Sequence, residues 1–174
     1  MTVGQVVVIV LRIVLPLLIL RRPLAGGIVA MAIDALDVVI VEAFGSGGMG
    51  AHYHSIDKVL DLYYLGLEAW VSLGWVEMVP KILSLVLFGL RVVGVVAFEL
   101  TDWRPLLFIF PNLFENWFLF VAGRDRFMPS YRLDSIRRVV TWLVILYIPK
   151  FGQEYLLHIV QANPWDWIKR QFGW

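Results

Sequence analysis

The sequence predicts an all-α integral membrane protein, a polytopic transmembrane helix bundle of about six spans that forms one domain. Of its 174 residues, 60% are hydrophobic and 17% are charged, whereas a soluble domain usually carries about 25% charged residues. Several apolar runs approach the roughly 20 residues that a helix needs to cross a hydrocarbon core about 30 Å thick. The runs are continuous rather than alternating, which favours helices over a transmembrane barrel.

The first two spans are predicted at residues 5–20 and 27–44. Arg12 lies inside the first span, where it either extends to the membrane surface or pairs with an acid in the bundle. Asp34 and Asp37 lie one helical turn apart near the middle of the second span. A glycine-rich loop at residues 45–55 follows, as expected for a connection.

The third span, predicted at residues 57–75, carries a stripe of polar side chains. They recur at steps of four, three and four, and at about 100° per residue they share one helix face: Asp57, Asp61, Tyr64 and Glu68. Acids inside a membrane usually face a bundle interior or a water-filled cavity. The fourth span, residues 82–100, carries Arg91, for which this acidic stripe is the expected counter-ion.

The fifth and sixth spans, predicted at residues 105–122 and 139–160, also carry clustered polar groups. In the fifth span an amide–carboxylate–amide cluster lies on one face: Asn112, Glu115 and Asn116. The sixth span contains a second polar set: Lys150, Gln153, Glu154 and His158. The tail at residues 163–174 holds three tryptophans and two basic residues, and we expect it to lie in the membrane interface.

Acidic side chains in or beside the predicted spans outnumber basic ones by nine to four. A central aspartate costs about 2.5–3.5 kcal/mol on insertion scales, so surplus acids must be protonated, hydrated or bound to a cation. The sequence therefore predicts a site that binds or passes a cation, either a divalent metal such as Mg²⁺ or Mn²⁺ or a proton. Its predicted ligands are Asp34, Asp37, Asp57, Asp61, Glu68, Glu115, Glu154 and His158. Its supporting polar network is Tyr64, Arg91, Asn112, Asn116, Lys150 and Gln153.

The spacing Asp34-x-x-Asp37 followed by Asp57-x-x-x-Asp61 resembles the four-aspartate motif of CDP-alcohol phosphatidyltransferases. This resemblance implies a metal-dependent enzyme in which Asp34, Asp37 and Asp57 hold metal. Asp61 would be a ligand and the general base, and hence the catalytic residue. More broadly, the segments DKVLDLYYL, FELTDWRPLLFIFPNLFENWF and IPKFGQEYLLHI are similar to uncharacterised small bacterial integral membrane proteins. A third possibility is a non-catalytic subunit of a membrane complex, which uses its acids only to dock.

Composition limits the cofactors and partners. The chain has no cysteine, which excludes an iron–sulfur cluster, and haem is not expected because only His158 is a credible ligand within a span. The net charge of +1 and the lack of a basic patch interleaved with aromatic residues argue against nucleic-acid binding. The expected partners are the lipid bilayer, a small cation or a lipid head group, and further subunits in a homo-oligomer or a larger complex.

The distribution of basic residues predicts an orientation in the bacterial cytoplasmic membrane. The loops after spans one, three and five share one side, and together they hold eight bases: Arg21, Arg22, Lys81, Arg124, Arg126, Arg132, Arg137 and Arg138. The opposite side holds four: Lys58, Arg104, Lys169 and Arg170. The positive-inside rule then puts both termini and the glycine-rich loop outside the cell.

Overall fold

A computed structural model describes residues 2–43, 51–103 and 105–156 of the chain. Within these ranges every regular element is helical, which confirms the predicted all-α class. The elements in chain order are α1 (Val3–Val14), the 3-10 helix η1 (Leu15–Leu20), α2 (Pro23–Ala43), α3 (Ala51–Ser72), α4 (Met78–Thr101), α5 (Pro105–Ile109), α6 (Leu113–Phe127) and α7 (Ile136–Glu154).

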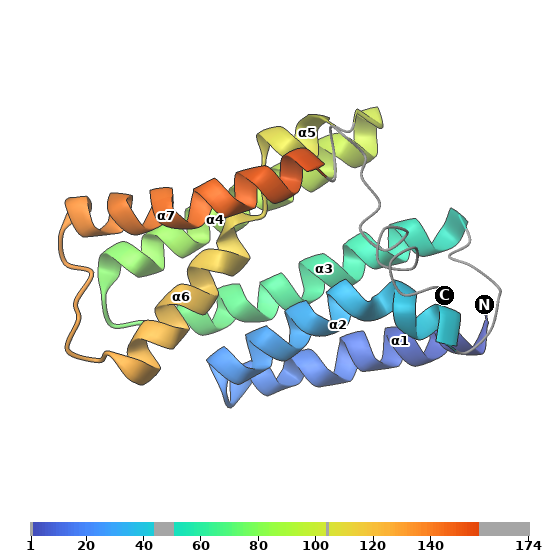
Figure 1. Cartoon of the computed structure of the whole chain (residues 1–174), viewed down its shortest axis with the longest axis horizontal. Coiled ribbons are helices and arrows are strands. Elements are labelled where there is room, and N and C mark those ends of the chain that lie inside the picture. The colour runs from blue at the N-terminus through green and yellow to red at the C-terminus, as the bar shows by residue number, and fades with distance from the viewer. Residues whose placement is uncertain (1, 44–50, 104, 157–174) are drawn as a thin grey trace, which may run out of the picture.

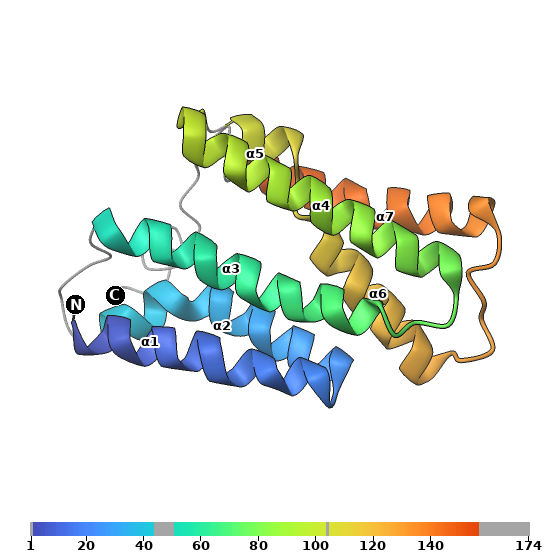
Figure 2. The same ribbon diagram turned by 180° about the vertical axis from the view of Figure 1, so that it is seen from behind.

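The helices form two groups joined by α6 (Figures 1 and 2). Helices α1, α2 and α3 lie side by side in one group, and α4, α5 and α7 lie in the other. Helix α6 crosses between the groups and contacts α2, α3, α4 and α7. Its aromatic side chains Phe114, Trp117 and Phe118 are completely buried. The apolar core therefore follows α6, and each group contributes one side of it.

The first predicted span is one continuous helical segment with a change of helix type. Thr2 and Gln5 form a capping box at its start. Pro16, in the first turn of η1, has no N–H to donate, which favours a tighter turn from Leu15 onward. The backbone of Ile19 lies against Gly26 of α2, and this close approach needs a residue without a Cβ atom.

The fifth predicted span is interrupted, in contrast to the continuous helix expected over residues 105–122. Helix α5 ends at Ile109 and α6 begins at Leu113. Pro111 lies in the break, because proline cannot donate a backbone hydrogen bond and disfavours a helical residue before it. The interruption places Asn112 at the N-terminal cap of α6.

Other boundaries differ more modestly. Helix α3 begins at Ala51 and ends at Ser72, so it takes over part of the predicted glycine-rich loop and stops short of residue 75. Helix α7 begins at Ile136, earlier than the predicted residue 139. The last part of the sixth predicted span and the interfacial tail at residues 163–174 lie outside the described residues.

Within the described ranges, two helical segments are long and apolar enough to cross a membrane: Val3–Leu20 and Met78–Thr101. Only 33% and 22% of their apolar windows are buried, whereas the core helix of a soluble protein is mostly buried. On α4 a stripe of exposed apolar side chains runs along the helix: Ile82, Val86, Leu90, Val93 and Val96. The predicted number of six spans is not confirmed, since helices such as α2 and α3 carry several acids and α6 has 15 residues.

Candidate cation site

Arg12 is the centre of an acidic cluster formed by three helices. Its side chain, on α1, is only 3% exposed. Its Nη1 atom donates to Asp37, at 3.1 Å, and to Asp57. Its Nη2 atom donates to Asp34 and Asp61. Of the two alternatives for Arg12 raised by the sequence, pairing with acids in the bundle is therefore the one observed.

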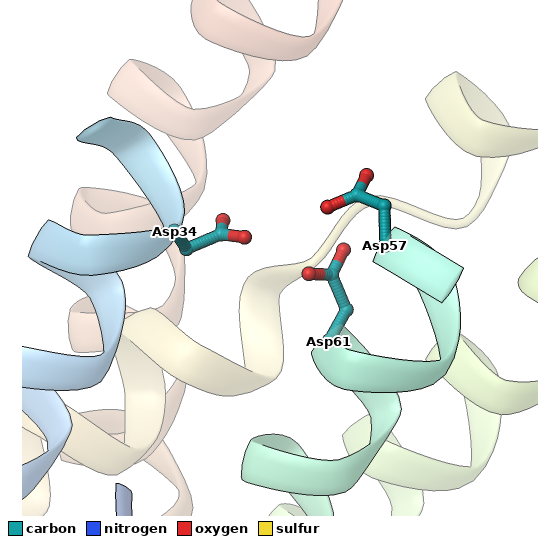
Figure 3. A group of neighbouring side chains, drawn as sticks. All are labelled: Asp34, Asp57 and Asp61. Carbon is teal, nitrogen blue, oxygen red and sulfur yellow. The ribbon is translucent and has the colours of Figure 1, made fainter. Parts of the chain in front are cut away.

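Helical periodicity explains how this cluster is assembled. Gln5, Val8 and Arg12 are buried residues on one face of α1, at the spacing of an inward-facing stripe. The two aspartates of α2 lie one turn apart, as do the two of α3, so each helix presents a pair of carboxylates to the same space. Figure 3 shows Asp34 of α2 facing Asp57 and Asp61 of α3.

Three of the four aspartates form a group that could hold a metal ion. One carboxylate oxygen from each of Asp34, Asp57 and Asp61 lies within 4.8 Å of the others. Their side chains are 34%, 33% and 21% exposed, whereas Asp37 is 9% exposed. Counted over these five side chains alone, four ionised carboxylates exceed the one guanidinium by three negative charges. The cluster is thus anionic and partly open to its surroundings.

A second polar group lies further along the same face of α3. The Tyr64 hydroxyl donates to Oε1 of Glu115 at 2.9 Å, and the Asn112 amide donates to Oε2 of the same carboxylate at 3.2 Å. All three residues are buried. Glu115 is in the first turn of α6, where the positive end of the helix favours an acid. The break at Pro111 therefore contributes directly to this group.

Glu68 is the most isolated acid of the stripe. It is completely buried, and among the described residues neither carboxylate oxygen has a hydrogen-bond partner. It faces Gly27, where a Cβ atom would lie 3.0 Å from Oε1 of Glu68 and 2.7 Å from Leu119. An ionised carboxylate without a partner is very costly in such apolar surroundings. Glu68 therefore favours a bound proton, a water molecule or a cation.

The remaining predicted residues are only partly brought together. Lys150 and Gln153 of α7 form a hydrogen bond of 3.3 Å, and Lys150 and Arg91 are close enough to interact with the charge of Glu115. In the described structure the Nε and Nη1 atoms of Arg91 have no hydrogen-bond partner. The expected pairing of Arg91 with the α3 stripe is therefore not observed, and Arg12 provides that counter-ion instead.

Three predicted site residues are not placed in either polar group: Asn116, Glu154 and His158. Asn116 is half-buried on α6, and its side chain forms no hydrogen bond with the described residues. The side chain of Glu154 and the whole of His158 lie outside the described residues.

One ion pair joins a base and an acid that the sequence places in or beside the spans but does not match to each other. Lys58 of α3 pairs with Glu99 of α4, and its ammonium lies 3.9 Å from the centre of the Phe98 ring. This pair connects the two helix groups near the acidic cluster. It also neutralises one of the surplus acids.

No family model, curated protein or solved structure matches this chain. The function must therefore be inferred from the chemistry of the acidic cluster itself.

Proposed function

We propose that the chain is an integral protein of the bacterial cytoplasmic membrane whose aspartate cluster around Arg12 binds or passes a cation. The observation that carries this proposal is that carboxylate oxygens of Asp34, Asp57 and Asp61 lie within 4.8 Å of one another, beside the Arg12 guanidinium. Three other bases of the described structure lie near other acids: Lys58 pairs with Glu99, and Arg91 and Lys150 lie near Glu115.

The donor atoms indicate which cations would fit. Carboxylate oxygens are the ligands of Mg²⁺, Mn²⁺ and Ca²⁺, while Zn²⁺ and Fe²⁺ favour sites with histidine or cysteine. Arg12 already occupies the inner side of the cluster, next to Asp37. A divalent ion would bind on the more exposed side, through Asp34, Asp57 and Asp61. Mg²⁺ usually retains several water ligands, which suits a site that is a fifth to a third exposed.

Protons are the alternative cargo, and the stripe on α3 supports this version. Beyond the aspartates, Tyr64 and Glu115 form a hydrogen-bonded pair and Glu68 lies without a partner. Acids and hydroxyls in such a series are the groups that proton relays in membranes use. Binding at the aspartates and passage along α3 are compatible, because both relieve the same excess of negative charge.

The metal version is tested by titrating the purified protein in detergent with Mn²⁺ and counting bound ions by electron paramagnetic resonance. The double variant D34N/D61N should weaken Mn²⁺ binding by about tenfold or more, because it removes two of the three open ligands. Asp134→Asn is the matched control, since this exposed acid pairs only with Arg138 in the described structure. Equal Mn²⁺ affinity in all three proteins would exclude the site.

The proton version is tested in liposomes that contain a pH-sensitive dye and carry an imposed potential. Glu68→Gln should reduce proton flux, whereas Glu99→Gln, an exposed acid outside the stripe, should not. If wild-type protein neither binds divalent ions nor moves protons, the cation proposal fails. That result is what a non-catalytic subunit of a membrane complex would give.

A second candidate function is a metal-dependent transferase that resembles the CDP-alcohol phosphatidyltransferases. The convergence of all four motif aspartates on one point favours it. In the reaction, an alcohol oxygen attacks the phosphorus that carries the lipid, the bond to CMP breaks, and Asp61 takes the alcohol proton. Purified protein with Mg²⁺ or Mn²⁺ should then release CMP from a CDP-lipid and an alcohol, and Asp61→Asn should not. Absence of CMP release across a panel of alcohols rejects this function.

A further inference from the structure

A cavity of about 830 Å³ lies at the end of the bundle where η1 turns into α2. Three segments line it: the corner between η1 and α2, the C-terminal end of α3 with the first residues after it, and the C-terminal part of α6. Three arginines contribute to its wall: Arg21, Arg22 and Arg126. Among the described residues none of the three forms an ion pair. The cavity is therefore a concentration of uncompensated positive charge, in contrast to the acidic cluster on α2 and α3.

The one acid in this wall does not balance the arginines. Asp125 is paired with Arg124 at 2.9 Å, and Arg124 also binds Glu77 at 2.8 Å. Burial raises the pKa of the Asp125 carboxyl, an effect that Arg124 opposes and Glu77 reinforces. The first turn of α2 also lines the cavity, and the positive end of a 21-residue helix favours an anion.

The rest of the wall is apolar and includes Leu24, Val71 and Trp75. Arginine is well suited to phosphate, which its planar guanidinium can bind through two hydrogen bonds. A tryptophan beside such a group is typical of the membrane interface, where an amphipathic ring meets head groups. A ligand that matches both the arginines and the apolar side chains of the cavity has a phosphate next to an apolar portion.

We propose that the cavity between the η1–α2 corner, α3 and α6 binds the phosphate group of an anionic phospholipid through Arg21, Arg22 and Arg126. This inference rests on the membrane location proposed above and is independent of cation binding. Basic pockets between helices on the cytoplasmic side are a known form of lipid recognition. The cavity lies at the end where the basic loops gather, which the positive-inside rule assigns to that side.

The test titrates detergent-solubilised protein with dioctanoyl-phosphatidylglycerol and follows binding by isothermal titration calorimetry. The double variant R22Q/R126Q should weaken binding by about tenfold or more, because it removes two charge-assisted contacts. The matched control is R132Q/R137Q, which removes the same charge from the same end of the bundle but outside the cavity. Equal losses in both double variants would reduce the effect to general electrostatic attraction and overturn the site.

Two further ligands separate the possible sources of the phosphate. Dioctanoyl-phosphatidylcholine, which has no net charge, should bind much more weakly than the anionic lipid. Glycerol 3-phosphate supplies the phosphate without the acyl chains, and it should also bind weakly if the apolar wall contributes. Tight, arginine-dependent binding of glycerol 3-phosphate with none of the lipid would overturn the lipid assignment in favour of a soluble phosphate ester. Failure of cation binding in the separate Mn²⁺ experiment leaves this result unaffected.

Discussion

Arg12 is the residue on which the acidic cluster depends. Its guanidinium forms ion pairs with four carboxylates: Asp34, Asp37, Asp57 and Asp61. Removing one partner of a buried ion pair leaves an uncompensated buried charge, which is much more costly than losing an exposed pair. The Lys58–Glu99 pair gives the contrast, since its side chains are 26% and 44% exposed.

Arg12→Gln should lower the free energy of unfolding in detergent by about 3–5 kcal/mol, because four carboxylates lose their shared cation. Lys58→Gln should cost about 0–1 kcal/mol, as expected for an exposed pair. Chemical denaturation in the same detergent measures both changes.

A double variant separates charge from packing. In R12Q/D61N one surplus anion is removed, so part of the stability lost in Arg12→Gln should return. The two substitutions should therefore be non-additive, as expected for residues in contact. A loss for Arg12→Gln no greater than that for Lys58→Gln would contradict the central role of Arg12.

The residue scale also shows how far the sequence predicts this site. The steps of four, three and four along α3 correctly placed Asp57, Asp61, Tyr64 and Glu68 on one face, because helical periodicity is a local property. The partner of that face could not be found in the same way. Arg12 contacts acids that lie 22 to 49 residues away in the sequence, and only the packing of α1 against α2 and α3 brings them together.

At the scale of elements, the interruption between α5 and α6 is the main departure from the sequence prediction. Pro111 was visible in the sequence, but hydrophobicity on both sides of it suggested one continuous span. The break frees the first turn of α6, and Asn112 and Glu115 meet Tyr64 there. Helices interrupted inside a membrane protein often carry polar sites, because the exposed backbone ends add fixed charge.

The packing of η1 against α2 requires a glycine at position 26. A Cβ atom at this position would lie 2.6 Å from the carbonyl carbon of Leu18 and would also meet the backbone of Ile19. Backbone atoms of a packed corner cannot move aside as a flexible side chain can. The η1–α2 corner therefore fixes how Arg12 and the aspartates of α2 approach one another.

Gly26→Ala should lower the free energy of unfolding by about 1–3 kcal/mol or more, which is the usual cost of overpacking. Gly66→Ala is the matched control, because nothing lies within 4 Å of a Cβ atom there. In that helix interior, alanine should stabilise by about 0.5–1 kcal/mol. Thermal unfolding of both variants measures the difference, and similar melting temperatures would contradict the close approach at Gly26.

At the scale of the whole molecule, charge is distributed unevenly between the two ends of the bundle. The η1–α2 corner and the α3–α4 and α6–α7 connections lie toward one end, which is on the left in Figure 1. The sequence predicts that the basic loops lie on one side, and the order of the helices places these connections at the same end. The acidic cluster lies on the side of α2 and α3 nearer the opposite end. One molecule thus presents a basic end and an acidic interior.

This asymmetry predicts how the protein is oriented if, as proposed, it spans a membrane. The chain contains no cysteine, so single cysteines can be introduced without removing any. Thr101, at the end of α4, and Ser130, in the connection between α6 and α7, are both exposed. Thr101→Cys should react with a membrane-impermeant maleimide in intact cells, and Ser130→Cys should react only after permeabilisation, because the positive-inside rule keeps the basic end in the cytoplasm.

The same two positions also test whether the interrupted segment crosses the membrane, since α5 and α6 lie between them. Labelling of Ser130→Cys but not Thr101→Cys in intact cells would reverse the orientation and put the arginine-lined cavity outside. Labelling of both would mean that α5 and α6 together do not cross, despite the buried position of α6 at the centre of the bundle. Labelling of Thr101→Cys alone in intact cells is the result that puts the acidic cluster nearer the outer face. A cation from the medium would then reach Asp34, Asp57 and Asp61 without passing the basic end.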